Sequence, residues 1–171
     1  MKRVWNGGVS ALIFLGVCVL ALGLAGCGGG SGSGTEKTSD RLSAAAYKAQ
    51  LAAISKQADV AHRALDRGAP SAKTVAQVQT LLRHYGTAEA RIGAEVSKLR
   101  APVNAETANA ELARGERDDA AEIQALLPKL AKFKTVQQAF AYLQKLGHTK
   151  GGYEQDEAIS TLKNLGYTTG S

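Results

Sequence analysis

The chain has 171 residues, a formal net charge of +6 and only two cysteines, Cys18 and Cys27. Because both cysteines lie near the N-terminus, the rest of the chain can form no internal disulfide. It must fold on its hydrophobic core alone, which is feasible for a domain of about 130 residues. The modest positive charge makes nucleic acid a poor partner.

An uncharged, apolar segment from Val9 to Ala25 follows the positively charged start Met1-Lys2-Arg3. This segment is shorter than the roughly 20 apolar residues of a membrane-spanning helix. A positive start, an apolar stretch of about 7–15 residues and small residues at the cleavage site are typical of a secretory signal peptide. The sequence therefore predicts a signal peptide over residues 1–26.

The apolar segment ends in Leu24-Ala25-Gly26-Cys27, which resembles the lipobox of bacterial lipoprotein precursors. The resemblance implies that the Cys27 thiol receives a diacylglycerol, and that a dedicated peptidase recognises Leu24, Ala25 and Gly26 and cleaves before the cysteine. Cys18 also has a leucine three residues before it, but a bulky valine directly precedes it. We therefore expect Cys18 to leave with the signal peptide.

The resemblance also implies where the protein lies. Acyl chains such as palmitate on Cys27 would anchor it to the cell membrane on the extracytoplasmic side, periplasmic or outer, because two chains hold stably where one binds weakly. Residues 27–39 are then the lipidated cysteine and a flexible Gly/Ser-rich tether that spans about 20 Å. Loss of residues 1–26 removes two cations and no acid, which lowers the net charge to +4.

The domain over residues 40–171 is alanine-rich, and none of its segments alternates in the manner of a strand. Two long helices are predicted first, over about 40–67 and 71–100, with Gly68 between them. In both, apolar residues recur at steps of three and four, which places them on one helix face.

A third long helix is expected to begin near Pro102 to Asn104, with Asn104 as its N-cap. Its apolar stripe runs to Phe133 and is weaker around Gly115 to Asp119. Pro128 should kink or end this helix, because proline cannot donate the backbone hydrogen bond.

Two short helices complete the prediction. The first, over 135–146, starts at Thr135 with a glutamine three residues later, which is the form of a capping box, and Gly147 suits its C-cap. The second spans about 154–165, between a break at Gly151-Gly152 and Gly166. Because the connections are short, we expect an all-α fold, an antiparallel helical bundle of three long helices plus two short C-terminal helices. Its many alanines predict a thin core.

The histidines do not suggest a metal site. His62 and His84 lie beside the apolar stripes, and at 1.5 Å per residue they are offset by about 12 Å along adjacent antiparallel helices. We expect both to be exposed and neither to be a ligand. The mature chain has no methionine for a His/Met haem site, and it has no Glu-x-x-His pair for a di-metal centre. No metal or cofactor is predicted.

Three acidic positions deserve comment. Glu89 falls on an apolar stripe, which permits two interpretations. It is either a buried acid with a raised pKa, or it leans outward to a lysine or arginine at the rim; the second is the expectation. Asp118 and Asp119 are expected to form a solvated acidic face.

Five lysines fall within residues 123–153, a stretch that contains no acid. Near an anionic membrane each surface cation adds about 1 kcal/mol of attraction, so this end of the domain could lie against the lipid. The alternative, which we favour, is a solvated face with lysines placed near helix C-termini. The five lysines, called the basic patch below, are Lys129, Lys132, Lys134, Lys145 and Lys150.

The sequence has no G-x-S-x-G motif and no phosphate-binding loop, so no catalytic residue is predicted. Beyond the lipobox, the layout is similar to that of small extracytoplasmic helical lipoproteins of high-GC bacteria. We expect a non-enzymatic binding or scaffolding module at the cell envelope, with an envelope protein as partner. The alternative is a carrier of a small apolar ligand or lipid between the helices. A pocket that gathers an acid and a histidine would favour an enzyme.

Overall fold

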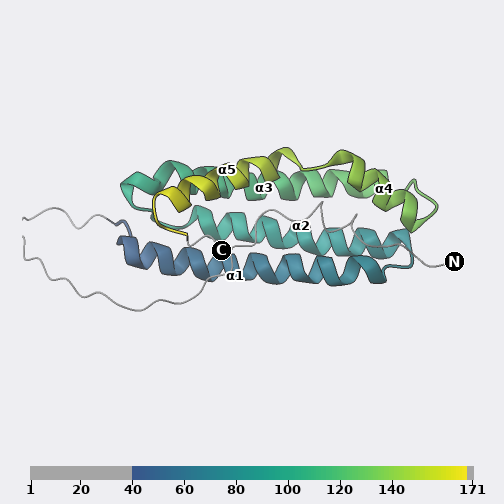
Figure 1. The fold of residues 1–171 in the computed structure, drawn as a ribbon, viewed down its shortest axis with the longest axis horizontal. Helices are drawn as coiled ribbons and strands as arrows, with labels where there is room; N and C mark the ends of the chain where they lie inside the picture. Colours follow the sequence, from purple (N-terminus) through teal and green to yellow (C-terminus); the bar gives the residue numbers. More distant parts are fainter. Residues whose placement is uncertain (1–39, 169–171) are drawn as a thin grey trace, which may run out of the picture.

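The computed structural model describes residues 40–168, so the lipobox, Cys27 and the tether lie outside the described residues. Within them the chain is all-helical and has no strand. Residues 40–168 form five α-helices (Figure 1), and two short 3-10 turns, Ala69–Ser71 and Val103–Ala105, join the first three. The α-helices are α1 (Ala44–Gly68), α2 (Val75–Ser97), α3 (Glu106–Leu130), α4 (Val136–Leu146) and α5 (Lys150–Asn164).

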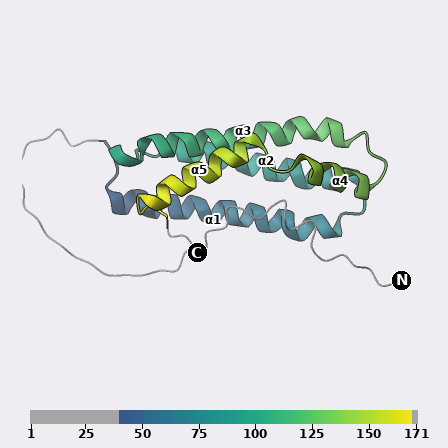
Figure 2. The same ribbon diagram turned by 45° about the horizontal axis from the view of Figure 1, so that its top comes forward.

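The three long helices run antiparallel, as predicted, and the two short helices return along the same bundle (Figures 1 and 2). Helix α5 packs against α3, and its end reaches back to α1, where the rings of Tyr47 and Tyr167 meet at 5.0 Å. Helix α4 lies at the opposite end of the bundle, where it contacts α2. The expected all-α bundle of three long and two short helices is confirmed.

Side-chain caps fix most of the helix N-termini. Helix α1 starts at Ala44, four residues later than expected, and the Ser43 side chain caps it. Thr74 and Thr135 each form a capping box with a glutamine three residues later, so α2 starts later than expected and α4 starts as expected. Gly147, after α4, has φ +68°, and Gly166, after α5, has φ +79°. Both therefore take the left-handed conformation that glycine tolerates best.

One expectation for α3 is wrong, and another is met only approximately. Asn104 does not cap the helix, because its side chain instead accepts a hydrogen bond from the Tyr167 hydroxyl (2.9 Å). The helix begins after a 3-10 turn, with Ala105 in the N-cap position and no side-chain cap. Pro128 lies inside α3, which continues to Leu130. The helix ends two residues after Pro128, near the point at which a proline was expected to kink or end it.

Most of the hydrophobic core lies toward the end of the bundle where α1 begins and α5 ends. Tyr47, Ile92 and Leu162 are its largest fully buried members, and alanines such as Ala105 and Ala158 fill much of the rest. The Tyr47 hydroxyl donates to Asn109 Oδ1 (3.0 Å), and Asn109 Nδ2 donates to the Val96 carbonyl (3.1 Å). These bonds satisfy the polar atoms that reach into this core.

Helix α5 begins four residues earlier than expected, and its glycines explain why. Thr149 caps it, and Gly151 and Gly152 form part of the first turn rather than a break. A Cβ on Gly151 would lie 2.2 Å from the Asp119 backbone nitrogen, and a Cβ on Gly115 would lie 2.9 Å from the Gln155 nitrogen. Glycine is therefore needed at both places for α3 and α5 to pack backbone to backbone.

Candidate functional site

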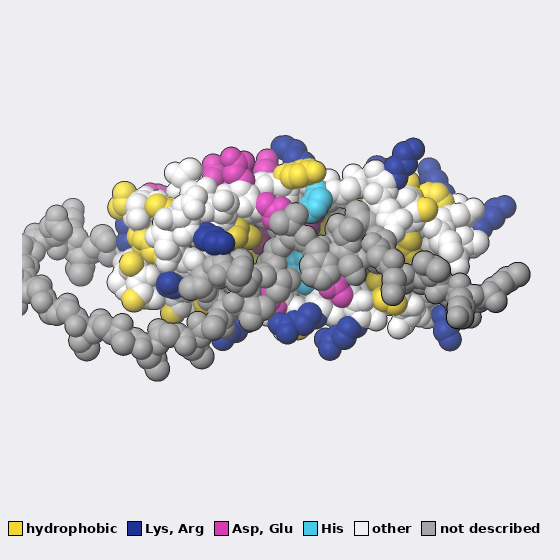
Figure 3. All heavy atoms as spheres, in the orientation of Figure 1, with side chains coloured by type: hydrophobic (Ala, Val, Ile, Leu, Met, Phe, Trp, Pro, Cys, Tyr) yellow, Lys and Arg dark blue, Asp and Glu magenta, His cyan; other side chains and the backbone are white. Residues whose placement is uncertain are grey.

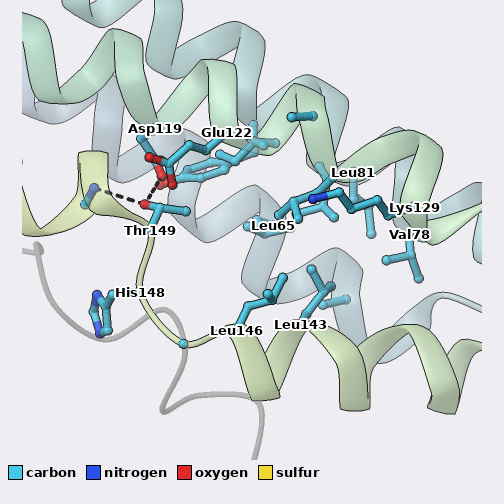
Figure 4. Close-up of a pocket in the computed structure, with 18 of the residues that line it drawn as sticks. Leu65, Val78, Leu81, Asp119, Glu122, Lys129, Leu143, Leu146, His148 and Thr149 are labelled. Atoms are coloured by element: carbon cyan, nitrogen blue, oxygen red, sulfur yellow. Dashed lines mark hydrogen bonds between the residues drawn. The ribbon is translucent and has the colours of Figure 1, made fainter.

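A cavity of about 430 Å³ opens between the α3–α4 end of the bundle and the start of α5. Its volume falls in the roughly 300–1,000 Å³ range of small-molecule sites. Most of its wall is apolar. Figure 4 shows Leu143 and Leu146 of α4 pointing toward Leu65 of α1 and Leu81 of α2. The other large apolar side chains that line it are Val78, Leu82, Ile123, Leu126 and Phe140.

One end of this cavity is acidic. Asp119 and Glu122, one turn apart on α3, both face the start of α5 (Figure 4). The Thr149 hydroxyl donates to Asp119 Oδ1 and accepts from the Gly152 backbone N–H (3.0 Å), and the Lys150 backbone N–H donates to Glu122 Oε2 (3.1 Å). The two acids therefore lie at the N-terminus of α5, where the helix dipole favours negative charge.

Two more carboxyl groups lie behind the acidic end, inside the bundle. Glu89 of α2 is 1% exposed and Glu116 of α3 is 6% exposed. No protein donor among the described residues reaches Glu89 Oε1 or Glu116 Oε2. The two groups face each other closely enough to hydrogen-bond, which requires a proton on one of them because a carboxylate can only accept. The expectation that Glu89 leans outward to a cation at the rim is wrong.

Burial governs the titration of this cluster. Burial, then the hydrogen bond with Glu89 and the charges of Glu89 and Asp119, raise the pKa of Glu116 well above its usual value. Burial also raises the pKa of Asp119 to about 6, although the Thr149 hydroxyl opposes the shift. Asp119 is 6% exposed, so the expected solvated face at Asp118-Asp119 is wrong for Asp119.

An aromatic pair links the cavity to the buried acids. Tyr85 of α2 lines the cavity, and its hydroxyl lies 3.4 Å from His62 Nε2, with the two rings 5.0 Å apart. Burial, and then the charge of Glu89, raise the pKa of Tyr85 well above its usual value. His62 Nδ1 is a buried atom without a hydrogen-bond partner. The expectation that His62 is exposed is therefore wrong, because its ring packs against Tyr85.

The other histidines differ from His62. His84 is exposed, as expected. His148 is half-buried at the cavity mouth, and its ring centre lies 5.2 Å from that of Tyr153. No group of three or more His, Cys, Asp or Glu side chains within residues 40–168 is arranged to hold a metal ion.

The basic patch is only partly a single surface. All five lysines are exposed, but Lys150 stands apart at the start of α5, where its Nζ pairs with Glu154 (3.3 Å). The other four lie on the end of α3, the turn after it and α4. Figure 3 shows dark-blue side chains projecting from this end of the bundle. Lys129 also lines the cavity, far from its acidic end (Figure 4).

Sequence reasoning identified Glu89 as a candidate but missed that three acids meet. The signal was present in the spacing. Leu112, Glu116, Asp119 and Ile123 follow one another at steps of four, three and four, so the acids continue the apolar stripe of α3 through its weak part. The weak part of this stripe faces Glu89 on α2, which packs against α3.

In comparisons with family models, curated proteins and solved structures, nothing matches this chain. Among the helices of residues 40–168, none combines the length and the apolar content that crossing a bilayer requires.

Proposed function

We propose that this chain is a lipid-anchored, extracytoplasmic and non-enzymatic binding protein that carries a small, largely apolar molecule in the cavity between its helices. The sequence offered this function as an alternative to a protein partner. The single observation that favours it is the cavity of about 430 Å³ with mainly leucine, isoleucine, valine and phenylalanine walls. Apolar walls with a few converging polar groups are typical of small-molecule sites.

The position of α4 supports this proposal. Three of its side chains, Phe140, Leu143 and Leu146, line the cavity, while Ala139 is its only fully buried residue. Leu146 is 45% exposed, so α4 has apolar surface that a ligand would help to cover. Burying such surface stabilises a complex by about 25 cal/mol per Å² before the costs of association.

The anchor would hold this cavity near the membrane but not against it. The tether enters at residue 40, at the end of the bundle where α1 begins, whereas the cavity and four lysines of the basic patch lie toward the other end. At 1.5 Å per residue, α1 alone is about 37 Å long. The basic patch would therefore touch lipid only if the bundle lay along the membrane surface.

Mass spectrometry of the protein purified from its own envelope tests the proposal. Organic extracts should contain a small molecule in near-stoichiometric amount. The substitution Leu126→Trp should fill the cavity and abolish the bound mass, whereas Val60→Trp, at a position that is 63% exposed and outside the cavity, should keep it. Circular dichroism verifies that both variants fold. An empty wild-type protein, or equal loading of both variants, would contradict the proposal.

The cavity also holds the combination of acid and histidine that favours an enzyme, in Asp119 and His62. Within residues 40–168, however, no hydrogen bond joins a histidine to an acid, and the Thr149 hydroxyl is engaged in docking and capping α5. An activated nucleophile needs such a base within hydrogen-bond reach, so the geometry supports binding better than catalysis. An envelope-protein partner remains a prediction, which crosslinking in cells tests.

A further inference from the structure

The acidic end of the cavity has chemistry that the apolar walls do not explain. We infer that the ligand is an amphiphilic amine, whose ammonium group binds at Asp119 while its apolar body lies along the leucine-lined wall. This inference rests on the proposed function, because it names the class of molecule that the same cavity would take.

Charge complementarity is the first argument. Asp119 and Glu122 line one end of the cavity, and the Glu89–Glu116 pair, which shares a proton, lies directly behind them. The cations that line the cavity do not neutralise this end: Lys150 Nζ pairs with Glu154, and Lys129 lies at the far end (Figure 4). An ammonium group placed there would be attracted strongly, because the surroundings are largely apolar and the effective dielectric constant is low.

Unused hydrogen-bond acceptors are the second argument. Thr149 engages only Oδ1 of Asp119, and none of the hydrogen bonds of the described residues uses Oδ2. Asp119 is 6% exposed and lines the cavity, and Oδ2 is not among the fully buried atoms, so a donor that enters the cavity can reach it. An ammonium group brings three donors to a site that offers acceptors.

The position of the apolar wall is the third argument. From Asp119 the cavity extends along α3 past Ile123 and Leu126 toward Lys129. Over these ten residues α3 advances about 15 Å, which accommodates an extended alkyl chain. The amine and its chain would thus lie along α3 and beneath α4.

Calorimetric titration of the lipid-free Cys27→Ser protein with octylamine, 1-octanol and octanoate tests the inference at pH 8. These probes share one chain and differ in the head group. We expect octylamine to bind roughly tenfold or more tightly than octanol, and octanoate to bind most weakly. Phosphatidylethanolamine vesicles added as competitor separate the sources of the amine: displacement indicates a membrane lipid, and no displacement indicates a free amine.

Two matched variants assign the effect to Asp119. Asp119→Asn keeps an oxygen for Thr149 and should weaken octylamine binding roughly tenfold while leaving octanol binding unchanged. Asp118→Asn removes the same charge one residue away, outside the cavity, and should change neither. If Asp119→Asn fails to fold, Glu122→Gln is the substitute and should weaken octylamine binding in the same sense.

The possible outcomes distinguish a failure of this inference from a failure of the proposed function. If octanol binds as tightly as octylamine to the wild-type protein, the inference is wrong and the apolar carrier remains. If none of the three probes binds, the proposed function fails as well. A preference for octylamine that survives Asp119→Asn would also overturn the assignment.

Discussion

Glu89 of α2 and Glu116 of α3 place their carboxyl groups against each other inside the bundle, with no protein donor reaching Glu89 Oε1 or Glu116 Oε2. Two carboxylates in this arrangement repel each other, whereas a proton shared between them provides the missing hydrogen bond. The bundle is therefore stable with one proton in this pair, and its stability should depend on pH in a sense opposite to that of most ion-paired acids.

Glu116→Gln tests this proton directly. The native pKa of Glu116 lies well above its usual value, so the native state holds a proton that the unfolded state releases as the pH rises above about 4.5. Wild-type stability should fall through this range, whereas the glutamine amide donates at every pH. We expect the variant to be more stable than the wild type by about 1–3 kcal/mol at pH 8, with little difference at pH 4. Urea unfolding at both pH values measures this.

The control for this experiment is Glu157→Gln, which changes an exposed glutamate on α5. It should shift the unfolding free energy equally at both pH values. A difference between Glu116→Gln and the wild type that does not change with pH would show that no proton is held at Glu116.

Asp119→Asn should reveal a second pH-dependent contribution to the free energy of unfolding. The pKa of Asp119 rises from 3.8 to about 6 on folding, so the native state binds the proton more tightly. The resulting destabilisation of the folded state is absent below pH 4 and complete above pH 6. Relative to the variant, the wild type should lose about 3 kcal/mol at most over this range. Thermal unfolding from pH 4 to pH 7 measures the change, and parallel curves would refute it.

Gly151→Ala should disrupt the packing of α5 on α3. The added Cβ would lie 2.2 Å from the Asp119 nitrogen and 2.7 Å from the Gly115 carbonyl oxygen, and neither backbone can move aside easily. We expect a loss of about 1–3 kcal/mol or more, as for other overpacked sites. The neighbouring Gly152→Ala meets only a side-chain oxygen at 3.0 Å and gains helix propensity, so it should cost far less. Equal urea midpoints for the two variants would contradict this packing.

Cys27→Ser tests the predicted anchor. Without the thiol no diacylglycerol can be attached, so the protein should move from the membrane to the soluble fraction. Intact-mass measurement should show the loss of the lipid. A variant that still sediments with membranes at the wild-type mass would refute the lipobox assignment.

Replacing lysines of the basic patch by glutamine tests whether the patch contacts lipid. Because we favour a solvated face for these exposed lysines, we expect glutamine at Lys129, Lys132 and Lys134 to leave cosedimentation of the Cys27→Ser protein with anionic vesicles nearly unchanged. The same substitution at Lys56, Lys98 and Lys163, three exposed lysines outside the patch, is the matched control. If the patch variant alone bound anionic vesicles about tenfold or more weakly, this result would instead show that the patch faces lipid.

The sequence alone determined the helical class, the number of helices, both ends of α4 and the C-terminal ends of α1 and α5. Local causes were sufficient for these features: apolar residues at steps of three and four, the Thr135 capping box, and glycine at position 147. The same local reasoning failed where a residue serves a distant partner. Asn104 was expected to cap α3 but binds Tyr167, and Gly151 was expected to break the chain but lies in α5 against α3.

The site was decided only by the tertiary structure. Glu89 interrupts one apolar stripe, and Glu116 and Asp119 interrupt another, but each interruption alone resembles a residue at the edge of a solvated face. Only the packing of α2 on α3 brings the interruptions together, and only the return of α5 places Thr149 on Asp119 and closes the acids off from water. Helical periodicity specifies which face a side chain occupies, whereas burial and charge depend on which face of another helix lies opposite, and that relationship is set by packing across the whole chain.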